Sequence, residues 1–126
     1  MEAPDPYTET MVIGLARTGI GVGSLLLPRT SGRVLFRRRP GSQTAVALRL
    51  FGACEIALGV GAVLAARRRT RAARGWVEAG ALADAGHVVA LLADRRAVRR
   101  ATRWGGIASA SVATTWGVRL ADRLAD

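Results

Sequence analysis

Four long apolar stretches, separated by short polar segments, dominate the hydrophobic pattern of the chain. They cover residues 11–27, 44–66, 76–93 and 104–121, and each is 17 to 23 residues long. A helix that crosses a bilayer needs about 20 residues, within a range of roughly 17–25. Residues 58–64 are apolar on every side, whereas a helix at the surface of a soluble bundle needs a polar stripe. The pattern therefore predicts four transmembrane helices.

Glycine and proline are distributed as membrane helices require. All four prolines lie outside the four stretches, and twelve of the 15 glycines lie inside them. Proline disrupts a helix interior, and in water each interior Gly costs a helix about 1 kcal/mol relative to Ala. In lipid, by contrast, Gly lets two helix backbones approach closely. We expect an all-α fold, an antiparallel bundle of four transmembrane helices joined by short Arg-rich loops, in one domain over residues 1–126.

The basic residues are concentrated between the apolar stretches. The formal net charge is +10, all 19 basic residues are Arg, and fifteen of them fall within 29–39, 67–74 and 95–103. A basic side chain near a membrane surface gains about 1 kcal/mol from anionic lipid. We therefore expect anionic headgroups as partners, and a soluble, Arg-rich helical protein that binds nucleic acid is the weaker alternative. The residues assigned to headgroups are Arg37, Arg38, Arg39, Arg67, Arg68, Arg69, Arg95, Arg96, Arg99 and Arg100.

The charge distribution also predicts an orientation. Four antiparallel spans place the first and third Arg clusters, with ten Arg, on one side of the membrane and both termini on the other. The positive-inside rule favours a cytoplasmic location for the ten-Arg side. The first ten residues carry three acidic residues and no basic one, unlike the start of a secretory signal. We expect a multi-pass protein of the bacterial inner (plasma) membrane with both termini outside.

Four ionisable residues, Arg17, Glu55, Asp84 and His87, fall near the middle of the apolar stretches. Such a residue costs about 2.5–3.5 kcal/mol at the centre of a membrane helix, so it needs a partner or a function. Their similar depths predict a buried polar network in which Arg17 pairs with Glu55 and Asp84, and His87 is a hydrogen-bond partner. One Arg facing two carboxylates leaves one negative charge in excess, unless an acid is protonated or His87 carries a proton.

Glycine occurs on the same helix face as each of these charged residues. The spacing is Gly-x-x-Arg-x-x-x-Gly around Arg17 and Gly-x-x-Glu-x-x-x-Gly around Glu55, and a Gly precedes Asp84 by four residues. Residues at these spacings share one side of a helix. The charged side chains are therefore expected to point into the bundle. The glycines expected to pack helices together are Gly14, Gly21, Gly52, Gly59 and Gly80.

Residues with catalytic or metal-binding potential are few. One Cys and one His cannot form a disulfide or a multi-Cys zinc site, and no Gly-rich phosphate loop or Ser/His/Asp arrangement occurs. Cys54 is interpreted as a small packing residue, because a thiol buried among apolar groups is not activated. We expect no enzymatic activity, no cofactor and no metal site.

Two short segments, 49–59 (RLFGACEIALG) and 80–84 (GALAD), carry a resemblance to known proteins. They match the patterns R-x-F-G-x-x-[DE]-x-x-L-G and G-x-x-x-D of a loose group of small actinobacterial integral membrane proteins, which the chain resembles over most of its length. These proteins have four predicted helices and are described only as domains of unknown function. The resemblance implies that the shared positions are Arg49, Gly52, Glu55, Gly59, Gly80 and Asp84.

The sequence favours a structural or accessory membrane subunit that acts through helix–helix and lipid contacts. Its partners would be membrane lipids and either other membrane proteins or a second copy of the chain. The alternative is a small proton-coupled or polar-ligand carrier that uses Glu55, Asp84 and His87. A proton path would need further polar groups that reach each surface, and the last apolar stretch supplies four hydroxyl groups, on Ser109, Ser111, Thr114 and Thr115.

Overall fold

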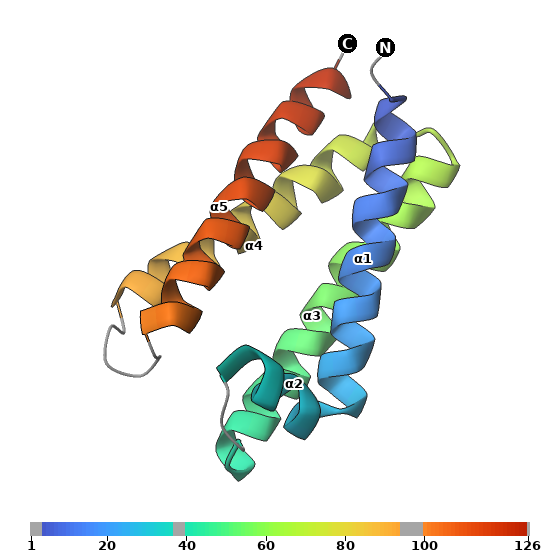
Figure 1. Ribbon diagram of the computed structural model, residues 1–126. Helices are drawn as coiled ribbons and strands as arrows, with labels where there is room; N and C mark the ends of the chain where they lie inside the picture. The colour runs from blue at the N-terminus through green and yellow to red at the C-terminus, as the bar shows by residue number, and fades with distance from the viewer. Residues whose placement is uncertain (1–3, 37–39, 94–99, 126) are drawn as a thin grey trace.

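The computed structural model describes residues 4–36, 40–93 and 100–125 and shows an all-α protein (Figure 1). Its helices are α1 (Pro6–Leu26), α2 (Pro28–Phe36), α3 (Ser42–Arg67), α4 (Ala72–Ala93) and α5 (Arg100–Arg123). No strand occurs within the described ranges. The all-α prediction is thereby confirmed, and each of the four long helices covers almost all of one predicted apolar stretch.

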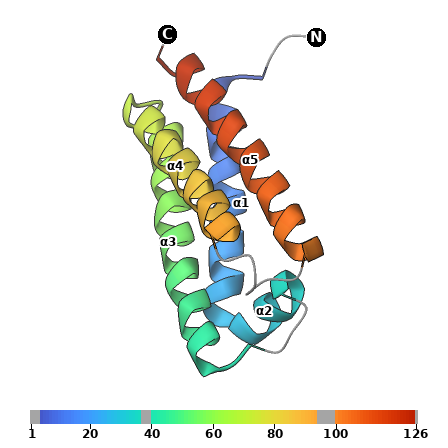
Figure 2. The same ribbon diagram turned by 90° about the vertical axis from the view of Figure 1, so that its left-hand side faces the viewer.

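The long helices form two antiparallel pairs. α1 packs along α3, and α4 packs along α5, whereas contacts between the pairs are fewer. Both termini lie at the end of the bundle where α3 leads into α4, and α2 lies at the opposite end (Figures 1 and 2). The small buried core of this arrangement contains Val77, Leu120 and Ala121, against which Ile13 and Leu124 pack.

One helix lies where the sequence predicted a loop. Residues 28–43 were expected to connect two spans, but Pro28–Phe36 forms α2. Pro28 occupies the first position of this helix, where a missing N–H costs nothing and the fixed φ of proline favours helix formation. The chain turns between α1 and the first part of α2 by 114°, so the segment folds back as a separate helix.

Fewer helices than predicted are long and apolar enough to cross a membrane. α3 and α4 meet this requirement, and α1 meets it only as a bent pair with Pro28–Val34, which gives two or at most three candidates among the described residues. The fourth predicted span, 104–121, corresponds to α5. Within residues 104–121, four Ser and Thr residues and Arg119 interrupt the apolar character.

The start of α1 is tied to the end of α3. Asp5 caps α1 by accepting a hydrogen bond from the Thr8 backbone N–H at 3.0 Å. Arg69, just beyond α3, has a left-handed φ of 48°, and its N–H donates to the Ala66 carbonyl at 3.0 Å. Its guanidinium donates to Asp5 at 2.9 Å and lies 4.5 Å from the centre of the Tyr7 ring. Arg69 therefore adopts a backbone conformation typical of glycine while its side chain holds the N-terminus.

This contact predicts a measurable change in the ionisation of Asp5. The hydrogen bond from the Arg69 side chain lowers the pKa of the Asp5 carboxyl below its ordinary value of 3.8. The folded-state pKa of Asp5 is lower than its pKa in the unfolded chain. The contact therefore stabilises the folded protein at pH values above the unfolded-chain pKa, and this contribution is lost as the pH falls through the folded-state pKa. We expect Arg69→Gln to raise the pKa of Asp5 toward 3.8 in an NMR titration of its carboxyl carbon.

Arg68→Gln provides the control, since Arg68 is an exposed neighbour with the same charge. It should leave the pKa of Asp5 where it is in the unmodified protein. If Arg69→Gln has no larger effect than Arg68→Gln, the interaction between Asp5 and Arg69 is absent in solution.

Candidate functional site

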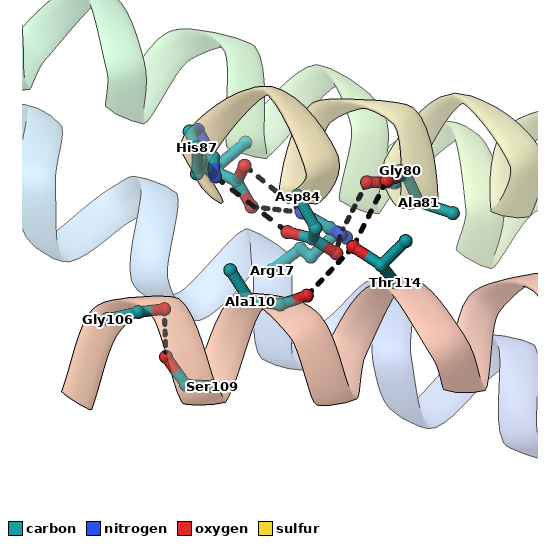
Figure 3. Close-up of polar contacts among 10 residues, drawn as sticks. Arg17, Gly80, Ala81, Asp84, His87, Gly106, Ser109, Ala110 and Thr114 are labelled. Carbon is teal, nitrogen blue, oxygen red and sulfur yellow. Dashed lines mark hydrogen bonds and ion pairs between the residues drawn. The ribbon is translucent and has the colours of Figure 1, made fainter. Parts of the chain in front are cut away.

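A single guanidinium joins three helices near the middle of the bundle. Arg17 on α1 donates from Nη1 to both carboxylate oxygens of Glu55 on α3, at 3.1 and 2.8 Å. From Nη2 it donates to the Gly80 carbonyl on α4 at 3.0 Å and to Asp84 Oδ2 (Figure 3). The structure thus brings together Arg17, Glu55 and Asp84, and we call these three residues the Arg17 network.

The side chains of the Arg17 network are largely buried. The exposed fractions of the side chains are 13% for Arg17, 5% for Glu55 and 11% for Asp84. Removing charges from water is costly unless each is paired with good geometry. The planar guanidinium suits this position because its fixed donors can serve two carboxylates at once.

His87 lies beside the network but does not hydrogen-bond to it, contrary to the prediction. Its Nδ1 is 3.8 Å from Asp84 Oδ1, which is too long for a hydrogen bond. The ring instead packs against Phe51, with 5.4 Å between ring centres, and 41% of the side chain is exposed. The three-residue spacing on α4 brings the two side chains to one face, where they lie within ion-pair distance if His87 is protonated.

The glycines bring α1 and α3 into backbone contact on both sides of the Arg17–Glu55 pair. A Cβ atom added at Gly14 would lie 2.7 Å from the Gly59 carbonyl oxygen, and one at Gly21 would lie 2.6 Å from that of Gly52. Side chains of any size would therefore separate the helices, because the neighbouring atoms belong to the backbone. The Gly14–Gly59 and Gly21–Gly52 contacts hold the helices close enough for Arg17 to reach Glu55.

Gly80 has a different role in the site. A Cβ atom there would lie 3.1 Å from Arg17 Nε, so the absence of a side chain leaves space for the guanidinium. The same residue offers its carbonyl oxygen to Arg17 Nη2. Gly80 therefore shapes the path of the Arg17 side chain instead of packing two helices together.

A second polar cluster, near the termini, was missed in the sequence. Glu9 on α1 is buried, and its carboxylate accepts hydrogen bonds from Trp116 Nε1 at 3.1 Å and from Arg123 Nη1 at 2.8 Å, both on α5. The sequence showed Glu9 only as part of an acidic tail. The seven-residue spacing of Trp116 and Arg123, which places both on one helix face, was the signal that could have revealed their common partner.

A cleft of about 880 Å³ runs between the two helix pairs. Its wall is predominantly apolar, and Arg17, Glu55, Asp84 and His87 line it part-way along. The sequence offered no signal for this cleft, because it arises from the way in which the α4/α5 pair is inclined to the α1/α3 pair (Figure 1).

The predicted headgroup residues are only partly described. Arg67, Arg68 and Arg69 are exposed at the end of α3, and Arg100 is exposed at the start of α5. Arg69 binds Asp5 in addition to being exposed. The remaining predicted residues lie outside the described ranges; they are Arg37, Arg38, Arg39, Arg95, Arg96 and Arg99.

The hydroxyl groups of α5 bond mainly within their own helix. Ser109 donates to the Gly106 carbonyl at 3.0 Å, Thr114 to that of Ala110 at 2.8 Å, and Thr115 to that of Ser111 at 2.9 Å. Thr114 also reaches the Ala81 carbonyl on α4, at 3.5 Å (Figure 3). These hydroxyls satisfy backbone carbonyls, as is common for Ser and Thr within helices.

Comparisons with models of known protein families, with curated proteins and with solved structures found no match. The chemistry of the site must therefore indicate its role.

Within the described ranges, no three His, Cys, Asp or Glu residues lie close enough to hold a metal ion. Cys54, expected to be a buried packing residue, is exposed on α3 instead, because it lies off the face that meets α1. The arrangement can pair charges and hold a ligand in the cleft.

Proposed function

We propose that the protein is a multi-pass protein of the bacterial inner membrane that acts as a structural or accessory subunit, without catalytic chemistry. The observation that carries the proposal is the Arg17 network, in which one charged side chain of α1 is held by α3 and α4 in the middle of apolar helices. Polar pairs of this kind fix the register of membrane helices. The resemblance of segments 49–59 and 80–84 to the actinobacterial membrane proteins supports the same proposal.

The outer faces of the bundle are suited to lipid. Large apolar side chains on every long helix are exposed, including Leu15 on α1, Leu50 on α3, Leu82 on α4 and Val112 on α5. Such side chains recur along each long helix, and large apolar surface exposed on a protein marks a site that contacts a membrane or a partner. In a bilayer, acyl chains would cover it, so these side chains support a membrane location.

We extend the proposal to four crossings. α3 and α4 are the two helices apolar enough to cross alone. α1 lies along α3, and α5 lies along α4, so each would occupy the same depth of the bilayer as its partner. The end of the bundle that carries α2 would face the cytoplasm, because the two connections made at that end, from α1 to α3 and from α4 to α5, belong to segments of the sequence that carry ten of the 19 Arg.

Membrane extraction tests this proposal. We expect the full chain, expressed in a bacterium, to remain in the membrane pellet after a wash with alkaline carbonate and to be released by detergent. A peripheral membrane protein bound only through its Arg clusters would be released by the wash, since its attachment is electrostatic and screened by salt. Recovery in the supernatant of a detergent-free lysate would overturn the membrane location.

A second candidate function is the binding or carriage of a ligand. The cleft between the helix pairs favours it, because a structural bundle has no need for a large cavity beside its buried charges. Its volume of about 880 Å³ falls within the range of roughly 300–1,000 Å³ that is typical of small-molecule sites. The residues concerned would be Glu55, Asp84 and His87.

A further inference from the structure

With both carboxylates ionised and His87 neutral, the charges on the cleft wall do not balance. Glu55 and Asp84 contribute two negative charges, and Arg17 contributes one positive charge, so a neutral His87 leaves one negative charge in excess. Asp84 Oδ1 is the carboxylate oxygen that Arg17 does not bind. Arg17 donates to Oδ2, whereas Oδ1 accepts no hydrogen bond from the described residues and lies 3.8 Å from His87 Nδ1.

The rest of the cleft suits an apolar molecule. Its wall includes aromatic side chains from three helices, Phe51 on α3, Trp76 on α4 and Trp116 on α5. Phe51 packs against His87 and therefore lies close to the unbalanced carboxylate. Aromatic faces attract cations as well as apolar groups, and the attraction is stronger where water is excluded.

We propose that this cleft binds a lipophilic organic cation, a molecule with an apolar body and a single ammonium-like charge. The charge would lie beside Asp84 Oδ1 and the body against the aromatic and aliphatic wall. This inference rests on the second candidate function above. An anionic amphiphile would meet two carboxylates, and a neutral molecule would leave the excess charge of the wall without compensation.

Tetraphenylphosphonium and tetraphenylborate provide a matched pair of probes, because the two ions have nearly the same size and shape and opposite charge. The purified full chain would be placed in phosphatidylcholine nanodiscs, and binding measured by equilibrium dialysis with empty nanodiscs as the background. We expect saturable binding of tetraphenylphosphonium at one site, at least about tenfold tighter than that of tetraphenylborate, since tenfold corresponds to a single moderate charge interaction.

Two variants on α4 separate the effect of the site from that of net charge. Asp84→Asn should weaken tetraphenylphosphonium binding about tenfold. Glu78→Gln removes the same charge from the same helix, but Glu78 binds Arg74 at 2.7 Å and lies outside the cleft wall. Glu78→Gln should therefore leave the affinity unchanged within about twofold. Equal losses in the two variants would overturn the proposal.

A third variant tests whether binding of tetraphenylphosphonium can be weakened without misfolding of the protein. Ala110 on α5 lines the cleft, and Ala110→Phe would narrow it without altering any charged residue. We expect weaker binding of tetraphenylphosphonium with thermal unfolding close to that of the unmodified protein.

Two failures can be told apart. Lack of saturable tetraphenylphosphonium binding by a protein that resists carbonate extraction, as expected if lipid chains fill the cleft, would overturn the cation site alone. Release of the protein by carbonate would overturn the proposed membrane function itself. Similar affinities for the two probes would show that the cleft recognises apolar shape without selecting charge, and this result would also overturn the proposal.

Discussion

Replacing Arg17 by Met is expected to destabilise the protein by about 3–5 kcal/mol, the typical cost of removing one partner from a buried ion pair. The substitution keeps an unbranched apolar chain but leaves Glu55 and Asp84 buried without their shared positive charge. It also removes the donor to the Gly80 carbonyl. Unfolding by SDS in mixed micelles, followed by circular dichroism, would measure the change in free energy.

Arg119→Met is the matched control. Arg119 is an exposed residue of α5, so the same substitution there removes a charge that is already solvated or at a headgroup. Its effect should stay within about 0.5 kcal/mol, as for most surface substitutions. Similar losses in the two variants would show that the energetics of Arg17 reflect general charge loss and not its three-helix contacts.

Gly21→Leu is expected to cost about 3 kcal/mol or more, at the upper end of the range for overpacked interfaces. A Cβ atom at this position would lie 2.6 Å from the Gly52 carbonyl oxygen and 2.7 Å from the Ile56 backbone nitrogen. Neither atom can move without shifting α3 as a whole. The helices would have to separate, and the reach of Arg17 to Glu55 would be lost with them. The same unfolding measurement applies.

Gly19→Leu is the control for helix propensity and added apolar volume. Gly19 belongs to the same helix, but no heavy atom beyond its own local backbone lies within 4 Å of a Cβ added there. Since Leu favours a helix over Gly by up to about 1 kcal/mol in water, this variant should be as stable as the unmodified protein or slightly more so. A loss of stability comparable to that of Gly21→Leu would contradict the close packing of α1 on α3.

The contact between Arg17 and Glu55 could be predicted from the sequence because two independent local patterns agreed. Glycines at helical spacing placed each charged residue on a close-packing face, and similar depths placed the two residues at the same level. In an antiparallel pair the glycines then meet in reverse order, Gly14 with Gly59 and Gly21 with Gly52. Local spacing thus determined both the contacting face and the register.

Features that depend on three-dimensional arrangement could not be predicted in this way. The sequence did not reveal α2, because this nine-residue segment, which begins with Pro28 and is soon followed by Pro40, has the composition of a polar loop. The cluster of Glu9 with Trp116 and Arg123 joins positions more than 100 residues apart in the chain. The cleft depends on the inclination of one helix pair to the other, for which no local pattern codes.

The most direct test of the Arg17 network is a double-mutant cycle between Arg17→Met and Glu55→Gln, measured as free energies of unfolding in mixed micelles. If the guanidinium pairs with the carboxylate as the 2.8 Å contact shows, Glu55→Gln should cost less when Arg17 is already absent. The predicted coupling energy is at least about 1 kcal/mol, within the range of roughly 0.5–3 kcal/mol found for residues in contact. Strict additivity of the two substitutions would contradict a network that joins α1, α3 and α4.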